Sequence, residues 1–302
     1  LTARLHVAQT VPAGWQPGES TPGAPLPQWR PVAGQWVIGN YGTRDLDIWF
    51  RLDLIPDASA PRDWLWVVAN PHLDQVDVIV MVDGQTVARW SGGNASAGRA
   101  DAVRAHPFLL SHLALKAGAE YTVYMHVHSR GVFYVPVSLW RPQAFWQADQ
   151  VRSVLSGLYF GLVAGLFAYN LFLYLLIRER VYLYYLGCIL ALTLSQLANT
   201  GLGAQWVWPS WAASSTFINN LAIACSAALA MLFLRAFLKT AQVAPRIDRW
   251  LRGSALAWLV VLMVLPFLDN VMAGYILGPA GFLTVVFLTL ITLNAVRERR
   301  PG

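Results

Sequence analysis

The sequence predicts a protein of two parts, an all-β jelly-roll or β-sandwich domain followed by an α-helical transmembrane bundle. Three observations predict it. Apolar and polar residues alternate in short segments of the first half, and long apolar stretches fill the second half. Only 13% of the 302 residues are charged, and 56% are hydrophobic. Because a soluble domain carries about a quarter of charged residues, much of this chain is expected to lie in a membrane.

The β-sandwich is expected over residues 35–148, after an irregular lead-in at 1–34 that is rich in Pro and Gly. The clearest strand is 46–54, in which every second residue is apolar from Leu46 to Leu54. Several short strands separated by turn residues are typical of a sandwich or jelly roll. The expected strands are 46–54, 64–69, 75–82, 86–90, 106–110, 120–128 and 132–140.

Two of these strands carry a candidate ligand-binding face. In 120–128 the apolar residues point one way, while Tyr124, His126 and His128 point the other way. In 46–54, Trp49 and Arg51 share the polar side. Aromatic rings beside hydrogen-bonding groups suit a small polar ligand or a carbohydrate. An ordinary solvent-facing sheet remains the alternative for this face.

Metal, cofactor and catalytic chemistry find little support in the sequence. Two histidines at i, i+2 are able to hold a metal, but no acid or cysteine is tied to them by spacing, so we expect no metal and no cofactor. The sequence has no phosphate-binding glycine loop, zinc-protease helix or nucleophile elbow. We therefore expect no enzymatic activity in these residues.

The second half contains five stretches with the length and apolarity of membrane-spanning helices, which need about 20 residues each. They form an expected bundle over 152–296, followed by a short tail at 297–302. The expected spans are 154–177, 181–199, 215–237, 252–269 and 272–295.

The basic residues of the second half predict an orientation. This half has 11 Lys and Arg against 4 acids, whereas residues 1–150 have 11 against 12. If the first span runs inward, 10 of the 11 basic residues fall on the inner side, and only Arg152 stays outside. The β domain is then extracytoplasmic and the C-terminus cytoplasmic. Because the basic residues flank apolar stretches, their expected partner is the lipid bilayer and not nucleic acid.

Small and amide residues predict contacts between the spans. Gly157, Gly161 and Gly165 recur every four residues, so they share one helix face. We expect this face to pack inside the bundle, with a homodimer as the alternative. Asn170 and Asn219 lie at membrane depth and are expected to form hydrogen bonds between helices. The spans carry no Asp, Glu, Lys or His at their centres, which disfavours ion or proton transport.

Short sequence segments in both halves resemble those of the bacterial seven-transmembrane receptors with diverse intracellular signalling modules. In the β half the extracellular domain of the second type, a carbohydrate-binding-like jelly roll, is matched by Ile48-Trp-Phe-Arg51, the segment from Trp64 to Asp74, and the segment from Tyr121 to Arg130. The membrane half matches more strongly. Its matching segments are 157–161, 168–174, 178–185, 199–202 and 233–238.

The resemblance implies a signal-transduction receptor in a bacterial inner membrane, with its sensor domain in the periplasm. Members of that family carry a cytoplasmic output module, such as a diguanylate cyclase or a histidine kinase. Because five spans are counted where the family has seven, we expect a truncated chain or a naturally short member. The alternative function is a transporter or channel component whose β domain recruits cargo or a partner.

Overall fold

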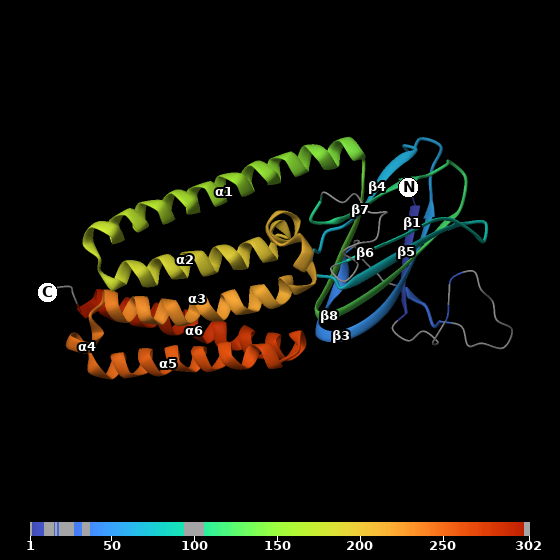
Figure 1. Cartoon of the computed structure of the whole chain (residues 1–302). Helices are drawn as coiled ribbons and strands as arrows, with labels where there is room; N and C mark the ends of the chain where they lie inside the picture. The colour runs from blue at the N-terminus through green and yellow to red at the C-terminus, as the bar shows by residue number, and fades with distance from the viewer. Residues whose placement is uncertain are drawn as a thin grey trace. The chain divides into compact units, whose positions relative to one another are not determined.

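The computed structural model describes residues 2–8, 15, 17, 27–31, 37–93 and 106–298 (Figure 1). The chain divides into two compact units. The first contains residues 1–151 together with 200–213, and the second contains 152–199 and 214–302. The first unit holds the β domain and the second holds the apolar helices, which confirms the predicted fold class.

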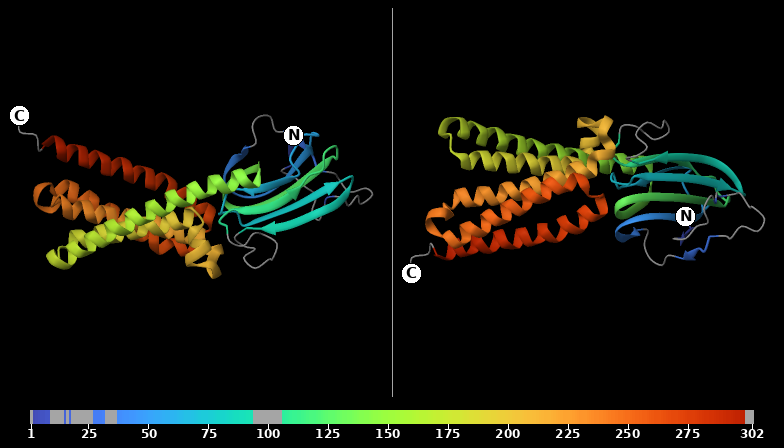
Figure 2. Two further views of the ribbon diagram at one scale, coloured as in Figure 1. Left: turned by 90° about the horizontal axis from the view of Figure 1, so that it is seen from above. Right: turned by 60° about the horizontal axis from the view of Figure 1, so that its bottom comes forward.

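The β domain is built from antiparallel strands in two sheets (Figure 2). Sheet A has the order β2-β1-β3-β8-β5-β6, and sheet B has the order β7-β4-β8. The long strand β8 belongs to both sheets, since its first part pairs with β3 and β5 and its last residues pair with β4. The strands are β1 (Thr2–Ala8), β2 (Arg30–Pro31), β3 (Val37–Ile55), β4 (Asp63–Val68), β5 (Gln75–Val82), β6 (Gln85–Gly92), β7 (Leu109–Ala114) and β8 (Tyr121–Trp140).

The hydrophobic core lies between the two sheets. Sheet A supplies the apolar face of β3, including Phe50 and Leu54, and the apolar face of β8, including Met125. Sheet B supplies Trp66 and Val68 of β4. The predicted alternation in 46–54 is confirmed from Ile48 onward, because these alternate residues are almost fully buried.

Several predicted boundaries differ from the structure. The strand predicted at 46–54 begins earlier, at Val37, and the span predicted at 252–269 begins earlier, at Pro245. The lead-in was expected to be irregular, but β1 pairs with β3 along its whole length. The candidates 120–128 and 132–140 are one continuous strand, β8. The candidate 106–110 is displaced, because β7 starts at Leu109 and ends at Ala114. The rest of the lead-in lies mostly outside the described residues. Leu46 belongs to β3, but its side chain is not described, so its predicted place in the alternation stays a prediction.

Within the part of the chain that the structure describes, five helices are long and apolar enough to cross a membrane, as the sequence predicted. The first begins earlier than expected, at Pro142, so the helix continues through the predicted domain boundary near residue 150. The helices are α1 (Pro142–Ile177), α2 (Arg180–Asn199), α3 (Ser215–Phe237), α4 (Thr240–Val243), α5 (Pro245–Val264) and α6 (Asn270–Glu298), with short helical turns at Gly203–Val207, Pro209–Ser214 and Leu265–Phe267.

Helix α3 organises the packing in the second unit, since it contacts α2, α5 and α6 (Figure 1). Between α2 and α3, the Ser195 hydroxyl donates to the Asn219 side-chain oxygen at 2.7 Å, which confirms the predicted interhelical bond for that amide. Asn170 instead donates to the Leu166 carbonyl on its own helix. The expected packing of Gly157, Gly161 and Gly165 is wrong, because no described atom outside their own helix lies near them.

Candidate ligand-binding face

The register of sheet A places the predicted ligand-binding residues side by side on its outer face. Trp49 of β3 is paired with His126 of β8, and Arg51 is paired with Tyr124. On the other side of β8, Asp77 of β5 is paired with His126. Because side chains alternate along each strand, this face is fixed by the burial of the opposite, apolar face.

An aromatic cluster covers one part of this face. The rings of Trp49 and His126 are stacked, with centroids 4.7 Å apart. Trp15 meets Trp49 edge-on at 5.2 Å and Tyr124 at 5.7 Å. Trp29 contacts both Trp15 and Tyr124. Two indoles from the lead-in therefore extend the aromatic surface that β3 and β8 begin.

His126 is held between two carboxylates on neighbouring strands. Its Nε2 atom bonds to Asp47 of β3, and its Nδ1 atom lies 3.6 Å from Asp77 of β5. Asp77 also accepts hydrogen bonds from Ser91 and from Gln75, the latter at 2.6 Å. This network fixes the plane of the imidazole and therefore the orientation of the Trp49 ring stacked on it.

Asp77 and His126 both have shifted pKa values. The bond to His126 is the largest reason that the pKa of Asp77 lies at about 2, below its ordinary 3.8. Burial disfavours the charged form of His126, but bonds to Asp77 and Asp47 outweigh it and raise the pKa of that imidazole. The two groups therefore favour an imidazolium facing a carboxylate.

A second polar group lies one pair further along the strands. The Arg51 Nε atom donates to Asp53 at 3.0 Å, and the Thr122 hydroxyl donates to the same carboxylate. His6 of β1 lies 3.7 Å from Asp53. Tyr124 is next to this group, and burial raises the pKa of its hydroxyl, so it stays a neutral donor and acceptor.

All five predicted site residues lie on this one face. Trp49, Tyr124 and His126 are in ring contact through the aromatic cluster, and Arg51 lies beside them. His128 is one pair away from the cluster, paired with Asp47 on one side and with Gln75 on the other. Whether these residues bind a ligand stays a prediction.

The sequence missed the groups that position the face. Asp77 was inside a predicted strand, but the strand order that brings β5 next to β8 is not written in any local pattern. Trp15 and Trp29 were placed in the lead-in, where no periodicity points to a partner. Among the described residues, no three His, Cys, Asp or Glu side chains gather in a way that suits a metal. Asp47 and Asp77 approach opposite nitrogens of His126, so these three cannot share one ion.

The outer face of sheet B, on the other side of the sandwich, carries the start of α1. Phe145 packs on Leu65, Val67 and Leu110 and is 5% exposed. Beside it, Nε2 of His106 lies 3.0 Å from the Asp149 carboxylate, and both side chains are largely buried. The first turns of α1 are therefore an integral part of the β unit.

The connection between α2 and α3 also belongs to the β unit. Gly201 has a φ of +75°, and an added Cβ would lie 2.8 Å from the side chains of both Pro71 and Pro107. Only glycine satisfies both demands without a shift of neighbours. Gly201 is thus fitted closely against two loops of the β domain.

Within the described residues, the chain thus combines a β domain with five apolar helices of membrane-spanning length. Residues 152–302 match the family model described as 7TM diverse intracellular signalling, and residues 22–141 match the model described as 7TMR-DISM extracellular 2. The chain belongs to this family, and it is a transmembrane sensor with an extracellular domain.

Other comparisons add little. None of the curated proteins matches the chain. Among solved structures, the β-glucuronidase of Ruminococcus gnavus is 14% identical over 42% of this chain and 20% of its own, with a TM-score of 0.25. The same enzyme in complex with D-glucuronic acid gives 15% identity over 41% of this chain and 21% of its own, with a TM-score of 0.25. The chain thus corresponds to about a fifth of that enzyme, and the likeness carries no argument about function.

Proposed function

We propose that the outer face of sheet A binds a small polar ligand, in the first instance a carbohydrate, and that binding is signalled to a cytoplasmic output module. The aromatic surface of Trp49 and Tyr124 offers apolar contact for the faces of a sugar ring. The Asp77–His126 pair and Arg51 supply donors and acceptors for hydroxyl groups.

The observation that carries this proposal is the path of β8. Its first part holds Tyr124 and His126 on the candidate face, and its last residues join sheet B. Only Arg141 separates the end of β8 from the start of α1, and Phe145 of α1 packs back on sheet B. A shift of β8 on ligand binding therefore reaches the first helix without crossing any flexible linker.

The Gly201 contact supports a second route. The loops at Pro71 and Pro107 touch the segment that leads from α2 to α3. A ligand is able to signal only if it prefers one of two arrangements of these parts. We place the β domain in the periplasm of a bacterial inner-membrane protein and the C-terminus in the cytoplasm, supported by the one-sided distribution of Lys and Arg.

The proposal is tested by titrating a panel of neutral and acidic monosaccharides into the full chain in lipid nanodiscs and following heat or tryptophan fluorescence. We expect saturable binding by at least one sugar. Trp49→Ala is expected to weaken it about five- to thirtyfold, since loss of ring contact removes about 1–2 kcal/mol. Trp206→Ala is the matched control, because Trp206 is 74% exposed and far from the face in the sequence. Absence of binding across the panel, or an equal loss in both variants, contradicts the proposal.

A further inference from the structure

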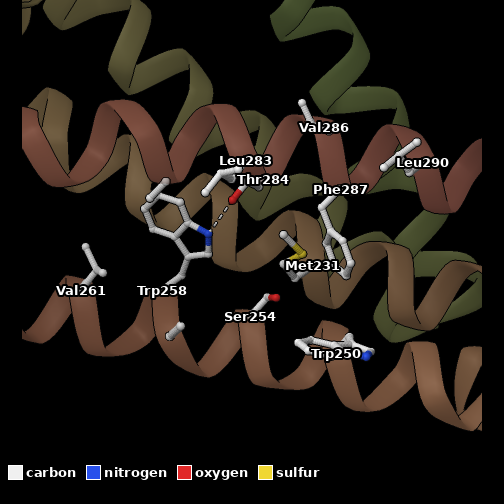
Figure 3. A pocket seen from close by; sticks show the side chains of 12 residues that line it. Met231, Trp250, Ser254, Trp258, Val261, Leu283, Thr284, Val286, Phe287 and Leu290 are labelled. Carbon is white, nitrogen blue, oxygen red and sulfur yellow. Dashed lines mark hydrogen bonds between the residues drawn. The ribbon is translucent and has the colours of Figure 1, made fainter.

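The helical unit contains an apolar groove that the sensor function does not use. It lies between α5 and α6, with Met231 of α3 at its base, and it has a volume of about 520 Å³ (Figure 3). Trp250, Ser254 and Trp258 line it from α5, and Thr284 and Phe287 line it from α6. This volume is in the range of ligand pockets in proteins.

The end of the groove at Trp258 is apolar. Trp258 is only 4% exposed, and its Nε1 atom donates to the Thr284 hydroxyl at 3.0 Å. The two side chains point toward one another between the helices (Figure 3). Because this bond satisfies both polar groups, the wall offers hydrocarbon contact to an occupant. Ala257 and Ala280 keep the groove open, since they are small residues on the facing helices.

The other end of the groove is marked by charge. Trp250 is 70% exposed, as expected of an indole at the level of lipid headgroups. Arg246 and Arg249 precede it on α5, one turn and one residue before it, and both are exposed. Arg246 shares the helix face of Trp250 and Ser254, because the three recur every four residues.

These two arginines keep their charge available. Asp248 is the one acid in α5. It is 4% exposed and is bound by Arg235 Nε at 2.6 Å, by Arg252 at 3.1 Å and by the Thr240 hydroxyl at 2.9 Å. Its hydrogen bonds are therefore directed to α3, α4 and the next turn of α5. No carboxylate on their own helix is left to neutralise Arg246 and Arg249.

We propose that this groove is a binding site for one anionic phospholipid. An acyl chain lies along Met231, Trp258 and Phe287, and the phosphate is held by Arg246 and Arg249 beside Trp250. Guanidinium groups suit phosphate because their fixed N–H groups match its oxygens. A zwitterionic headgroup carries a positive choline that offsets its phosphate, so the two arginines favour an anionic lipid, whose phosphate charge is not offset. The orientation proposed above places this end in the leaflet where anionic lipids attract basic residues.

A lipid in this position contacts both α5 and α6 and the α3 residue beneath them. Anything that binds the packed arrangement and not the separated helices stabilises the packed arrangement by mass action. Occupancy of the groove is therefore expected to hold α3, α5 and α6 together. No residue of the β domain lines this groove, so a failure of the lipid site and a failure of the ligand-binding face can be told apart.

The test is native mass spectrometry of the full chain in detergent, titrated with phosphatidylglycerol or with phosphatidylcholine. We expect one retained phosphatidylglycerol and a clear preference over phosphatidylcholine. The double variant R246Q/R249Q is expected to reduce that preference about twenty-fivefold, since each basic residue near an anionic headgroup contributes roughly fivefold. The matched control R178Q/R180Q removes the same charge from the connection after α1 and from the first residue of α2, and it is expected to keep the preference.

Filling the groove tests the acyl-chain half of the site. Ala257→Phe is expected to abolish retention of both lipids, and Ser254→Leu is a milder second variant that reduces it if the first one disturbs folding. An equal loss in R178Q/R180Q shows a bulk charge effect and overturns the proposal. The proposal is also overturned if the chain is a dimer that retains no lipid and that Ala257→Phe dissociates, because the groove then holds a second copy of the chain.

Discussion

The two outer faces of the β-sandwich differ in what covers them. The outer face of sheet A carries half-buried aromatic and charged groups, from Trp49 to Asp77, that contact one another and parts of the lead-in. The outer face of sheet B is apolar and is covered by Phe145 of α1. A shared strand, β8, supplies both faces. The difference indicates that the outer face of sheet A remains available for new contacts, whereas the outer face of sheet B is already covered by α1.

A substitution on the outer face of sheet B should lower the free energy of unfolding more than one on the outer face of sheet A. Phe145→Ala removes an almost fully buried ring from Leu65, Val67 and Leu110, and should lower the free energy of unfolding by about 3–4 kcal/mol. Chemical unfolding of the chain in nanodiscs measures it. The neighbouring Trp146→Ala is the control, because Trp146 is 41% exposed and should cost much less. Equal costs would mean that sheet B does not hold α1 through Phe145.

The Gly201 contact should rank second. Gly201→Ala places a Cβ against Pro71 and Pro107 in a left-handed backbone, and should cost about 2 kcal/mol. Gly118→Ala separates the two causes, since Gly118 has a φ of +79° but open space around it. Hydrogen exchange of residues 200–213 should rise in the Gly201 variant alone. Unchanged exchange there would show that the segment is not held by the two prolines.

The stability that the Asp77–His126 pair on the outer face of sheet A contributes should depend on pH. The raised pKa of His126 means that its pairing stabilises the fold fully below about pH 6.5 and ceases to do so as pH rises through the folded pKa. The lowered pKa of Asp77 means that its contribution is present above 3.8 and is lost as pH falls toward about 2. Stability from this pair should therefore be greatest between about pH 4 and pH 6.5, as thermal unfolding across pH would show.

Asp77→Asn sharpens that test. It should lower the pKa of His126, because it removes the largest favourable partner of the imidazolium, and should cost about 1 kcal/mol at pH 5. Histidine ring signals followed by NMR titration measure the pKa. His128→Gln is the control and should leave the pH profile in place. A profile that follows His128 instead would move the titrating group away from the Asp77 pair.

The smallest effect should be the loss of Trp49 without ligand. Trp49 is half-buried, so Trp49→Ala should lower the free energy of unfolding by only about 1 kcal/mol, while ligand binding falls about five- to thirtyfold. Comparing the two readouts in one variant distinguishes a recognition surface from a structural one. A cost close to that of Phe145→Ala would show that the aromatic cluster is part of the core.

The sequence by itself determined the division into β and membrane halves, the five spans and the polar face of β3 and β8. These follow from local periodicity, since the burial of Phe50 or Met125 fixes where Trp49 and His126 point. Only the tertiary structure decided that β1 joins the sheet, that β8 belongs to two sheets, and that Asp77 meets His126. It also decided that Phe145 and Gly201 belong to the β unit. Such contacts join residues far apart in the chain, and no local pattern records which strand becomes the neighbour of another.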